Sequence, residues 1–191
     1  MGRALRLGFG AATLLLGACT EPVDAGLDYH PLVTAAATTV PQAPRGCGLG
    51  IVEITDLRLD PATLGSIGGR VVHGPADSGA WLRNVLTGLG SYGIEVSFPA
   101  GEKAPSLTAS VTLVTAWVES LAVAKTSSVV LDARYRRDGA VVKEARYRGA
   151  ESTVNWFSSG DEIRAMIEDS WTQILAAMSG DAAALCAAPA G

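Results

Sequence analysis

The sequence is poor in the residues on which much enzyme chemistry and most nucleic-acid binding depend. Among 191 residues there are two histidines, and aromatic residues make up only 6%. Lysine and arginine number 15 against 19 aspartates and glutamates, which gives a formal net charge of −4. A nucleic-acid-binding domain usually carries a basic excess that neutralises phosphates, so we expect no nucleic-acid partner.

The sequence also lacks an apolar run near its start that is long enough to span a membrane, which takes about 20 residues. Leu7 to Leu16 is uncharged over only about ten residues, and it follows Arg3 and Arg6. A basic start, a short apolar run and small residues before a cleavage point are typical of a secretory signal. Residues 1–18 are therefore predicted to be a signal peptide.

The segment Leu16-Gly17-Ala18-Cys19 resembles the lipobox of bacterial lipoproteins. This resemblance implies that Cys19 is lipidated, with palmitate among its acyl chains, and that several chains anchor the mature protein stably. The next residue is Thr20 rather than the aspartate that retains such proteins in the inner membrane. We therefore expect attachment to the periplasmic face of the bacterial outer membrane. The alternatives are an ordinary cleaved signal with an incidental cysteine and a short buried helix.

Only two cysteines remain beside Cys19. Cys47 and Cys186 form an even pair in what would be an oxidising compartment, which favours a disulfide between them. A loop of about 140 residues would be closed, worth at most about 5 kcal/mol in the chain-entropy model. The alternatives are two free thiols or two cysteines that bind a metal ion, although no histidine lies close to either cysteine in the sequence.

Composition divides the mature chain into a linker, a domain and a tail. Residues 19–46 carry the lipidated cysteine, four prolines and no amphipathic period, which predicts a flexible linker that spans about 30 Å on average. Residues 47–186 are expected to form a single domain. Residues 187–191 are expected to be a disordered tail.

The hydrophobic pattern of the domain predicts strands at both ends of a first helix. Strands are expected at residues 49–57, 70–73 and 94–98, with a glycine-rich loop at residues 60–69. Asp77 or Ser78 is expected to cap the helix, which Gly90 or Gly93 ends.

The second half predicts a meander and a closing helix. Long alternating strands cover residues 107–123, 128–136 and 141–154, and Asp138-Gly139 has the composition of a two-residue hairpin turn. Ser158 or Ser159 caps the last helix, and Gly180 is expected to end it. The fold class is α+β, a two-layer sandwich with an antiparallel-rich sheet of four to five strands and two helices on one face.

No arrangement of residues predicts catalysis. Gly46 to Gly50 resembles a glycine-rich nucleotide loop but precedes a strand, so we interpret it as the end of the linker. Asp56 and Asp60 flank Arg58, which favours a local ion pair over an acid–base or metal site. His30 and His73 have no nearby nucleophile, and no Gly-x-Ser-x-Gly motif occurs. We expect no catalytic, cofactor-binding or metal-binding residues.

The tryptophans and the acidic residues of the last helix have plain structural interpretations. Core packing explains the tryptophans, with a lipid-binding crevice between the helices and the sheet as the alternative. The residues in question are Trp81, Trp117, Trp156 and Trp171. Glu162, Glu168 and Asp169 are expected on the solvated face of the last helix.

Several short motifs between residues 47 and 182 resemble the YajG-like family of outer-membrane lipoproteins. They are Asp56-x-Arg58, residues 64–68, Trp81-Leu82, Tyr92-Gly93-Ile94, Tyr135-x-x-Asp138-Gly139, Tyr147-x-Gly149 and residues 174–181. The resemblance implies an envelope lipoprotein without enzymatic activity and transfers no catalytic residue.

We therefore expect a non-enzymatic, lipid-anchored lipoprotein with a periplasmic binding or assembly domain. Its partners would be the membrane, through the lipid anchor, and an envelope protein or a lipid. The alternative is an auxiliary lipoprotein of an ABC-type lipid transport system, because the order of strands and helices is also similar to that of such proteins.

Overall fold

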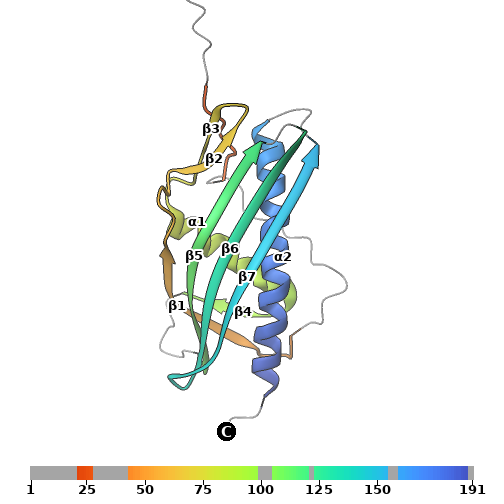
Figure 1. Ribbon diagram of the computed structural model, residues 1–191. Coiled ribbons are helices and arrows are strands. Elements are labelled where there is room, and N and C mark those ends of the chain that lie inside the picture. The colour runs from red at the N-terminus through yellow and green to blue at the C-terminus, as the bar shows by residue number, and fades with distance from the viewer. Residues whose placement is uncertain (1–20, 28–42, 99–104, 121–122, 155–158, 189–191) are drawn as a thin grey trace, which may run out of the picture.

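The computed structural model describes residues 21–27, 43–98, 105–120, 123–154 and 159–188 (Figure 1). Cys19, His30 and Trp156 lie outside these ranges, as do residues 189–191 of the predicted tail. The described elements are β1 (Gly48–Asp56), β2 (Thr63–Ile67), β3 (Arg70–His73), α1 (Ser78–Thr87), the 3-10 helix η1 (Gly88–Tyr92), β4 (Glu95–Ser97), β5 (Leu107–Ser120), β6 (Ala124–Arg137), β7 (Ala140–Val154) and α2 (Gly160–Ala187).

Strand β5 is the centre of one mixed sheet. It pairs antiparallel with β6 along its length, and β6 pairs antiparallel with β7. On its other side, the first half of β5 pairs parallel with β1 and the second half pairs parallel with β2. Strand β4 extends the sheet beside β1, and β3 extends it beside β2.

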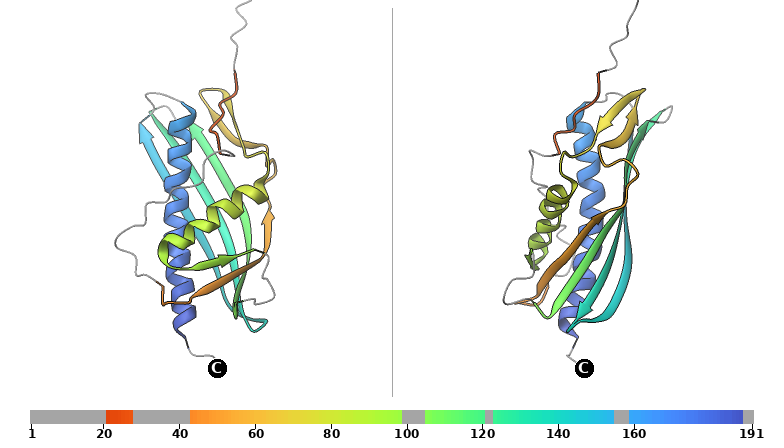
Figure 2. Two further views of the ribbon diagram at one scale, coloured as in Figure 1. Left: turned by 180° about the vertical axis from the view of Figure 1, so that it is seen from behind. Right: turned by 90° about the vertical axis from the view of Figure 1, so that its left-hand side faces the viewer.

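Both helices cover the same face of this sheet (Figure 2). The longer helix, α2, lies along β5, β6 and β7, and α1 crosses the same face beside it. The predicted α+β class, with two helices on one face, is confirmed. The sheet has seven strands among the described residues, rather than four to five, and three of its pairings are parallel.

Six of the seven strands lie where the sequence predicted a strand segment, although only four to five were expected in the sheet. The seventh is β2, which we expected to be part of a loop. Its glycine misled the prediction, because glycine usually weakens a strand. Gly65 has a φ of 111°, and a Cβ there would lie 2.2 Å from the Val118 carbonyl oxygen. Only glycine permits this close approach of β2 to β5.

The two helices begin as predicted. Asp77 caps α1, and its Oδ1 accepts a hydrogen bond from the Ala80 amide at 2.9 Å. Ser159 caps α2 in a capping box, in which its side chain accepts from the Glu162 amide and the Glu162 carboxylate accepts from the Ser159 amide. The hairpin between β6 and β7 also turns at Asp138 and Gly139, both with positive φ.

The predicted end of α2 at Gly180 is wrong. The helix continues through Gly180 to Ala187, and Gly180 has nothing within 4 Å of its Cβ position. Glycine in a helix interior costs only about 1 kcal/mol relative to alanine. Burial of Met178 and Ala182 on either side of Gly180 offsets this cost and keeps the helix intact.

The prediction of a flexible linker is wrong for residues 21–27, the first part of the linker that the structure describes. Val23, Ala25 and Leu27 are buried, with 3%, 1% and 8% of their surface exposed, and they belong to the hydrophobic core. Apolar residues at every second position place their side chains on one face of an extended segment. The prolines and glycines around this short pattern obscured it in the sequence.

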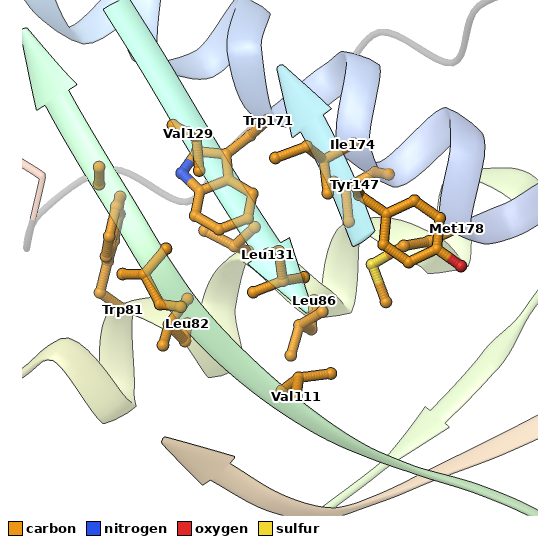
Figure 3. Packing of buried hydrophobic residues seen from close by; sticks show 14 of the residues in the cluster. Trp81, Leu82, Leu86, Val111, Val129, Leu131, Tyr147, Trp171, Ile174 and Met178 are labelled. Carbon is orange, nitrogen blue, oxygen red and sulfur yellow. The ribbon is translucent and has the colours of Figure 1, made fainter. Parts of the chain in front are cut away.

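The core lies between the helices and the sheet (Figure 3). Trp81 of α1 and Trp171 of α2 meet edge to face, with their ring centroids 5.5 Å apart. Leucines and valines of β5 and β6 pack beneath them. The interpretation of Trp81 and Trp171 as core residues is therefore confirmed.

Two glycines with different surroundings predict opposite effects of substitution by alanine. A Cβ at Gly149 of β7 would lie 1.8 Å from the Ser170 carbonyl oxygen of α2. We expect Gly149→Ala to lower the free energy of unfolding by about 3 kcal/mol, because the helix must move off the sheet. The control Gly180→Ala should raise it by about 0.5–1 kcal/mol, because it meets open space in a helix. Urea unfolding measures both, and an unchanged stability of Gly149→Ala would contradict the contact.

Candidate functional site

Residues 21–27, which we call the anchor segment, connect the predicted lipid attachment point to the domain. One side of this segment is bonded to β3. The Val23 amide donates to the Val71 carbonyl at 2.7 Å, and the His73 amide donates to the Val23 carbonyl at 3.0 Å. Arg70 adds a bond from its Nε to the Glu21 carbonyl at 2.8 Å. The segment therefore extends the β3 edge of the sheet.

The other side of the anchor segment lies against the first turn of α2. A Cβ at Gly160 would lie 2.0 Å from the Asp24 carbonyl oxygen, so the two backbones are in direct contact. Arg164 Nη1 donates to the Ala25 carbonyl at 3.4 Å. The anchor segment thus lies between β3 and α2, and it is fixed from both sides.

This arrangement leaves a short tether. Four residue steps separate Cys19 from Val23, which is at most about 14 Å of extended chain. The 27-residue flexible spacer expected from the sequence would span about 30 Å on average and about 90 Å when fully extended. A lipid on Cys19 would therefore lie close to one end of the domain.

The opposite end of the domain carries the disulfide. Cys47 precedes β1 and Cys186 lies in the last turn of α2, and the two are bonded with their Cα atoms 5.7 Å apart. The predicted pairing is therefore confirmed. It ties the C-terminal end of α2 to the start of β1, 139 residues away in the sequence.

Asp56 and Arg58 form an ion pair, as predicted. Arg58 Nη2 lies 2.7 Å from Asp56 Oδ2 and also donates to Ser78 Oγ at 2.9 Å. Its guanidinium carbon is 5.9 Å from the centre of the Trp81 ring. Burial opposes ionisation of Asp56, but the hydrogen bonds from Arg58 outweigh it, so the pKa of this carboxyl lies below its ordinary value. Both side chains are largely buried, and the hydrogen bond from Arg58 to Ser78 joins the end of β1 to the start of α1.

A tyrosine pair that the sequence reasoning missed joins β6, β7 and α2. The hydroxyls of Tyr135 and Tyr147 are 2.9 Å apart, and Tyr147 donates to Asp181 Oδ2 at 2.6 Å. Lys143 completes the group, with its Nζ 2.7 Å from Asp181 Oδ1. Burial raises the pKa of both tyrosines, so they remain neutral donors. The alternation of tyrosines on two strands was visible, but their common partner on the helix was not.

The face of the sheet away from the helices is lined with polar residues. It holds a shallow concavity of about 650 Å³, lined among others by Glu53, Thr112, Asp132, Arg136 and Arg146. Two ion pairs lie across it, since Arg146 Nε lies 2.7 Å from Asp132 Oδ1 and Arg134 Nε lies 2.5 Å from Glu144 Oε1. The Asp132 pKa is lowered by its hydrogen bond from Arg146.

An apolar group borders this polar face, and we call it the Trp117 patch. It consists of Leu57, Leu59 and Trp117, which line one shallow hollow of about 280 Å³ and are 63%, 106% and 45% exposed. Trp117 packs on the β2 backbone at Gly65, which holds the ring in place. For Trp117, the predicted burial in the core is therefore wrong, because its position on β5 points away from the helices.

The remaining residues considered as candidates in the sequence do not come together into a site among the described residues. The glycines of residues 46–50 lie at the start of β1, as expected for a linker end, and His73 is exposed on β3. Within the described ranges, no three histidine, cysteine, aspartate or glutamate side chains come together to hold a metal ion. No helix among the described residues is both long and apolar enough to cross a membrane.

Glu162 departs in part from the solvated role expected for it. It is partly exposed but pairs with Lys125 of β6, whose side chain is fully buried, at 3.0 Å. The hydrogen bond from Lys125 lowers the pKa of Glu162. The pair fixes the first turn of α2 to the start of β6.

Comparison with solved structures shows that the fold recurs. A Xanthomonas campestris protein of family DUF330 matches with a TM-score of 0.54 at 13% identity, covering 77% of this chain and 88% of its own. A hypothetical protein from Chlamydia trachomatis matches with a TM-score of 0.51 at 11% identity, covering 74% and 99%. A minor lipoprotein from Acinetobacter baumannii matches with a TM-score of 0.46 at 11% identity, covering 76% and 100%.

No family model and no curated protein matches the chain. The similar structures also include bacterial lipoproteins with TM-scores below 0.5. The two matches above 0.5 establish the fold alone, because their identities are 13% and 11%. The resemblance to the YajG-like family stays a prediction.

The disulfide predicts a stability that depends on the redox state. We expect reduction, or Cys47→Ala with Cys186→Ala, to lower the free energy of unfolding by up to about 5 kcal/mol, because the unfolded chain gains the entropy of a 139-residue loop. Urea unfolding with and without dithiothreitol measures this in a protein that carries Cys19→Ser. The double alanine variant is the control, since its stability should not respond to dithiothreitol. An equal midpoint for the oxidised and reduced protein would contradict the prediction.

Proposed function

We propose that the chain is a lipid-anchored envelope lipoprotein at the periplasmic face of the bacterial outer membrane, whose domain acts by binding rather than by catalysis. The observation that carries this proposal is the anchor segment. It begins two residues after the lipobox cysteine and is packed into the core. The folded domain therefore begins almost directly after the residue that would carry the lipid. A free spacer would not need buried residues so close to Cys19.

The roles of the polar side chains support binding over catalysis. Three polar groups each connect a strand to a helix. They are Asp56 and Arg58 through the bond from Arg58 to Ser78, the two tyrosines with Asp181, and Lys125 with Glu162. Groups that would otherwise be candidates for acid–base chemistry are thus engaged in holding the layers together. These contacts leave the polar face of the sheet, with the Trp117 patch, uncovered.

Lipidation is tested by the mass and the location of the protein. Purified wild-type protein should begin at Cys19 and carry the added mass of its acyl chains, and it should fractionate with outer membranes. Cys19→Ser should lose that mass and leave the outer-membrane fraction, because no acyl chains remain to bury in lipid. The control Cys47→Ser with Cys186→Ser keeps Cys19 and should remain lipidated. An unmodified Cys19 in wild-type protein would refute the lipoprotein assignment.

A second candidate function is an accessory role in an ABC-type lipid transport system. The Trp117 patch favours it, because an exposed aromatic residue held on a rigid strand is a common anchor of protein interfaces. The neighbouring ion pairs would form the polar rim that usually surrounds such an anchor.

Site-specific cross-linking distinguishes the accessory role from the general one. A photoreactive amino acid at position 117, activated in intact envelopes, should capture a subunit of a lipid transporter. The same group at Val142 is the control, because that residue is 43% exposed on β7 but lies away from the Trp117 patch. Capture of the same products from both positions, or of no transporter subunit, would count against the accessory role.

A further inference from the structure

The connections at one end of the domain lie side by side, and the strand register shows this. Ser66 of β2 pairs with Glu119 near the end of β5, so the β2–β3 turn lies beyond that end of β5. Ala124 at the start of β6 pairs with Val154 at the end of β7. Lys125 of β6 contacts Glu162 in the first turn of α2. We call this region the anchor end, since the anchor segment emerges there (Figures 1 and 2).

The anchor end presents apolar side chains to the outside. Val71 of β3 is 44% exposed, Val123 before β6 is 77% exposed, and Val154 of β7 is 56% exposed. Val123 and Val154 are neighbours across the β6–β7 pair, because the residue after Val123 pairs with Val154. Val71 lies beside the anchor segment, whose Val23 is bonded to its carbonyl.

The short chain between Cys19 and Val23 determines which end of the domain would lie next to a bilayer. At most about 14 Å of chain separates Cys19 from Val23, whereas α2 alone extends about 42 Å from the anchor end to the disulfide end. The disulfide end therefore lies farther from Val23 than the tether can reach. If the acyl chains of Cys19 are in a bilayer, the anchor end is the part of the domain next to it.

We infer that the anchor end is a membrane-contact surface, on which Val71, Val123 and Val154 rest against the lipid headgroup region. Helix α2 then extends from its first turn, near the bilayer, away from it. This inference rests on the proposed lipidation of Cys19. The docked anchor segment fixes the orientation. Released from β3 and α2, the tether would run from Cys19 to Ala43, which is bonded to Tyr92, and would span about 25–30 Å.

The test uses lipidated protein reconstituted in vesicles of phosphatidylethanolamine and phosphatidylglycerol. A polarity-sensitive fluorophore is attached to a single added cysteine, Val123→Cys or Val154→Cys at the anchor end, or Val142→Cys on β7 toward the other end. Lipids with a quenching group near the headgroup are then added. We expect most of the emission to be lost at positions 123 and 154, and no loss at position 142.

The anchor segment is tested with two matched substitutions in α2. Gly160→Ala places a Cβ 2.0 Å from the Asp24 carbonyl oxygen and should displace the anchor segment, whereas Gly180→Ala meets nothing within 4 Å. Quenching at position 123 should fall in Gly160→Ala and remain in Gly180→Ala. Val23→Asp provides a second way to release the segment. Cooperative thermal unfolding confirms that each variant is folded.

The outcomes separate this inference from the proposed function. Protein whose mass lacks acyl chains refutes the lipoprotein assignment before any vesicle is prepared. If the protein is lipidated and floats with the vesicles but quenching is equal at positions 123 and 142, or stronger at 142, the membrane-contact surface is overturned. Undiminished quenching at position 123 in both Gly160→Ala and Val23→Asp would overturn the role of the anchor segment.

Discussion

The packing of α2 along the sheet is the interaction on which the rest of this structure depends. The helix backbone contacts β7 directly at Gly149, where no side chain would fit. Deeper polar contacts fix its register, since Ser127 of β6 and Ser170 of α2 share a buried hydrogen bond at 2.7 Å. Such a buried contact is satisfied in only one register, whereas apolar contacts tolerate sliding. These contacts therefore fix both the position of α2 along the strands and its rotation about its own axis.

Each end of α2 then serves a different purpose. The first turn contacts the anchor segment through Gly160, and the last turn is bonded to Cys47 through Cys186. A force applied through a lipid on Cys19 would reach the sheet at the β3 edge and the helix at its first turn. Two points of attachment resist rotation about the short tether better than one does. The disulfide closes the far end, where the helix would otherwise fray from the sheet.

Much of this fold follows from local patterns in the sequence. The β6–β7 hairpin, the caps at Asp77 and Ser159 and the pairing of Cys47 with Cys186 all depend on short-range chemistry or simple counting. The prediction failed where a distant partner decides the outcome. Gly65 suggests a loop in the sequence, but in the structure it allows β2 to approach β5 closely. Gly180 suggests a helix end, but the burial of Met178 and Ala182 on either side of it keeps the helix continuous.

The candidate site was harder to predict for the same reason. Val23, Ala25 and Leu27 form a pattern too short to identify among prolines and glycines, and their burial depends on β3 and α2. The exposure of Trp117 depends on which face of β5 the helices cover. The lipidation of Cys19, by contrast, is a prediction that depends only on its immediate neighbours, since a lipobox is a linear signal and needs no fold.

The orientation that we infer at the membrane also bears on how the uncovered face of the sheet would be used. The long strands β5, β6 and β7 run between the anchor end and the opposite end, alongside α2 (Figure 1). If the anchor end rests on the bilayer, the polar face of the sheet and the Trp117 patch lie roughly perpendicular to the membrane plane. A partner would then approach along the membrane, and a neighbour anchored in the same bilayer meets this face without losing its own contact with lipid. Confinement to one surface raises the effective concentration of such a partner, so modest contacts suffice.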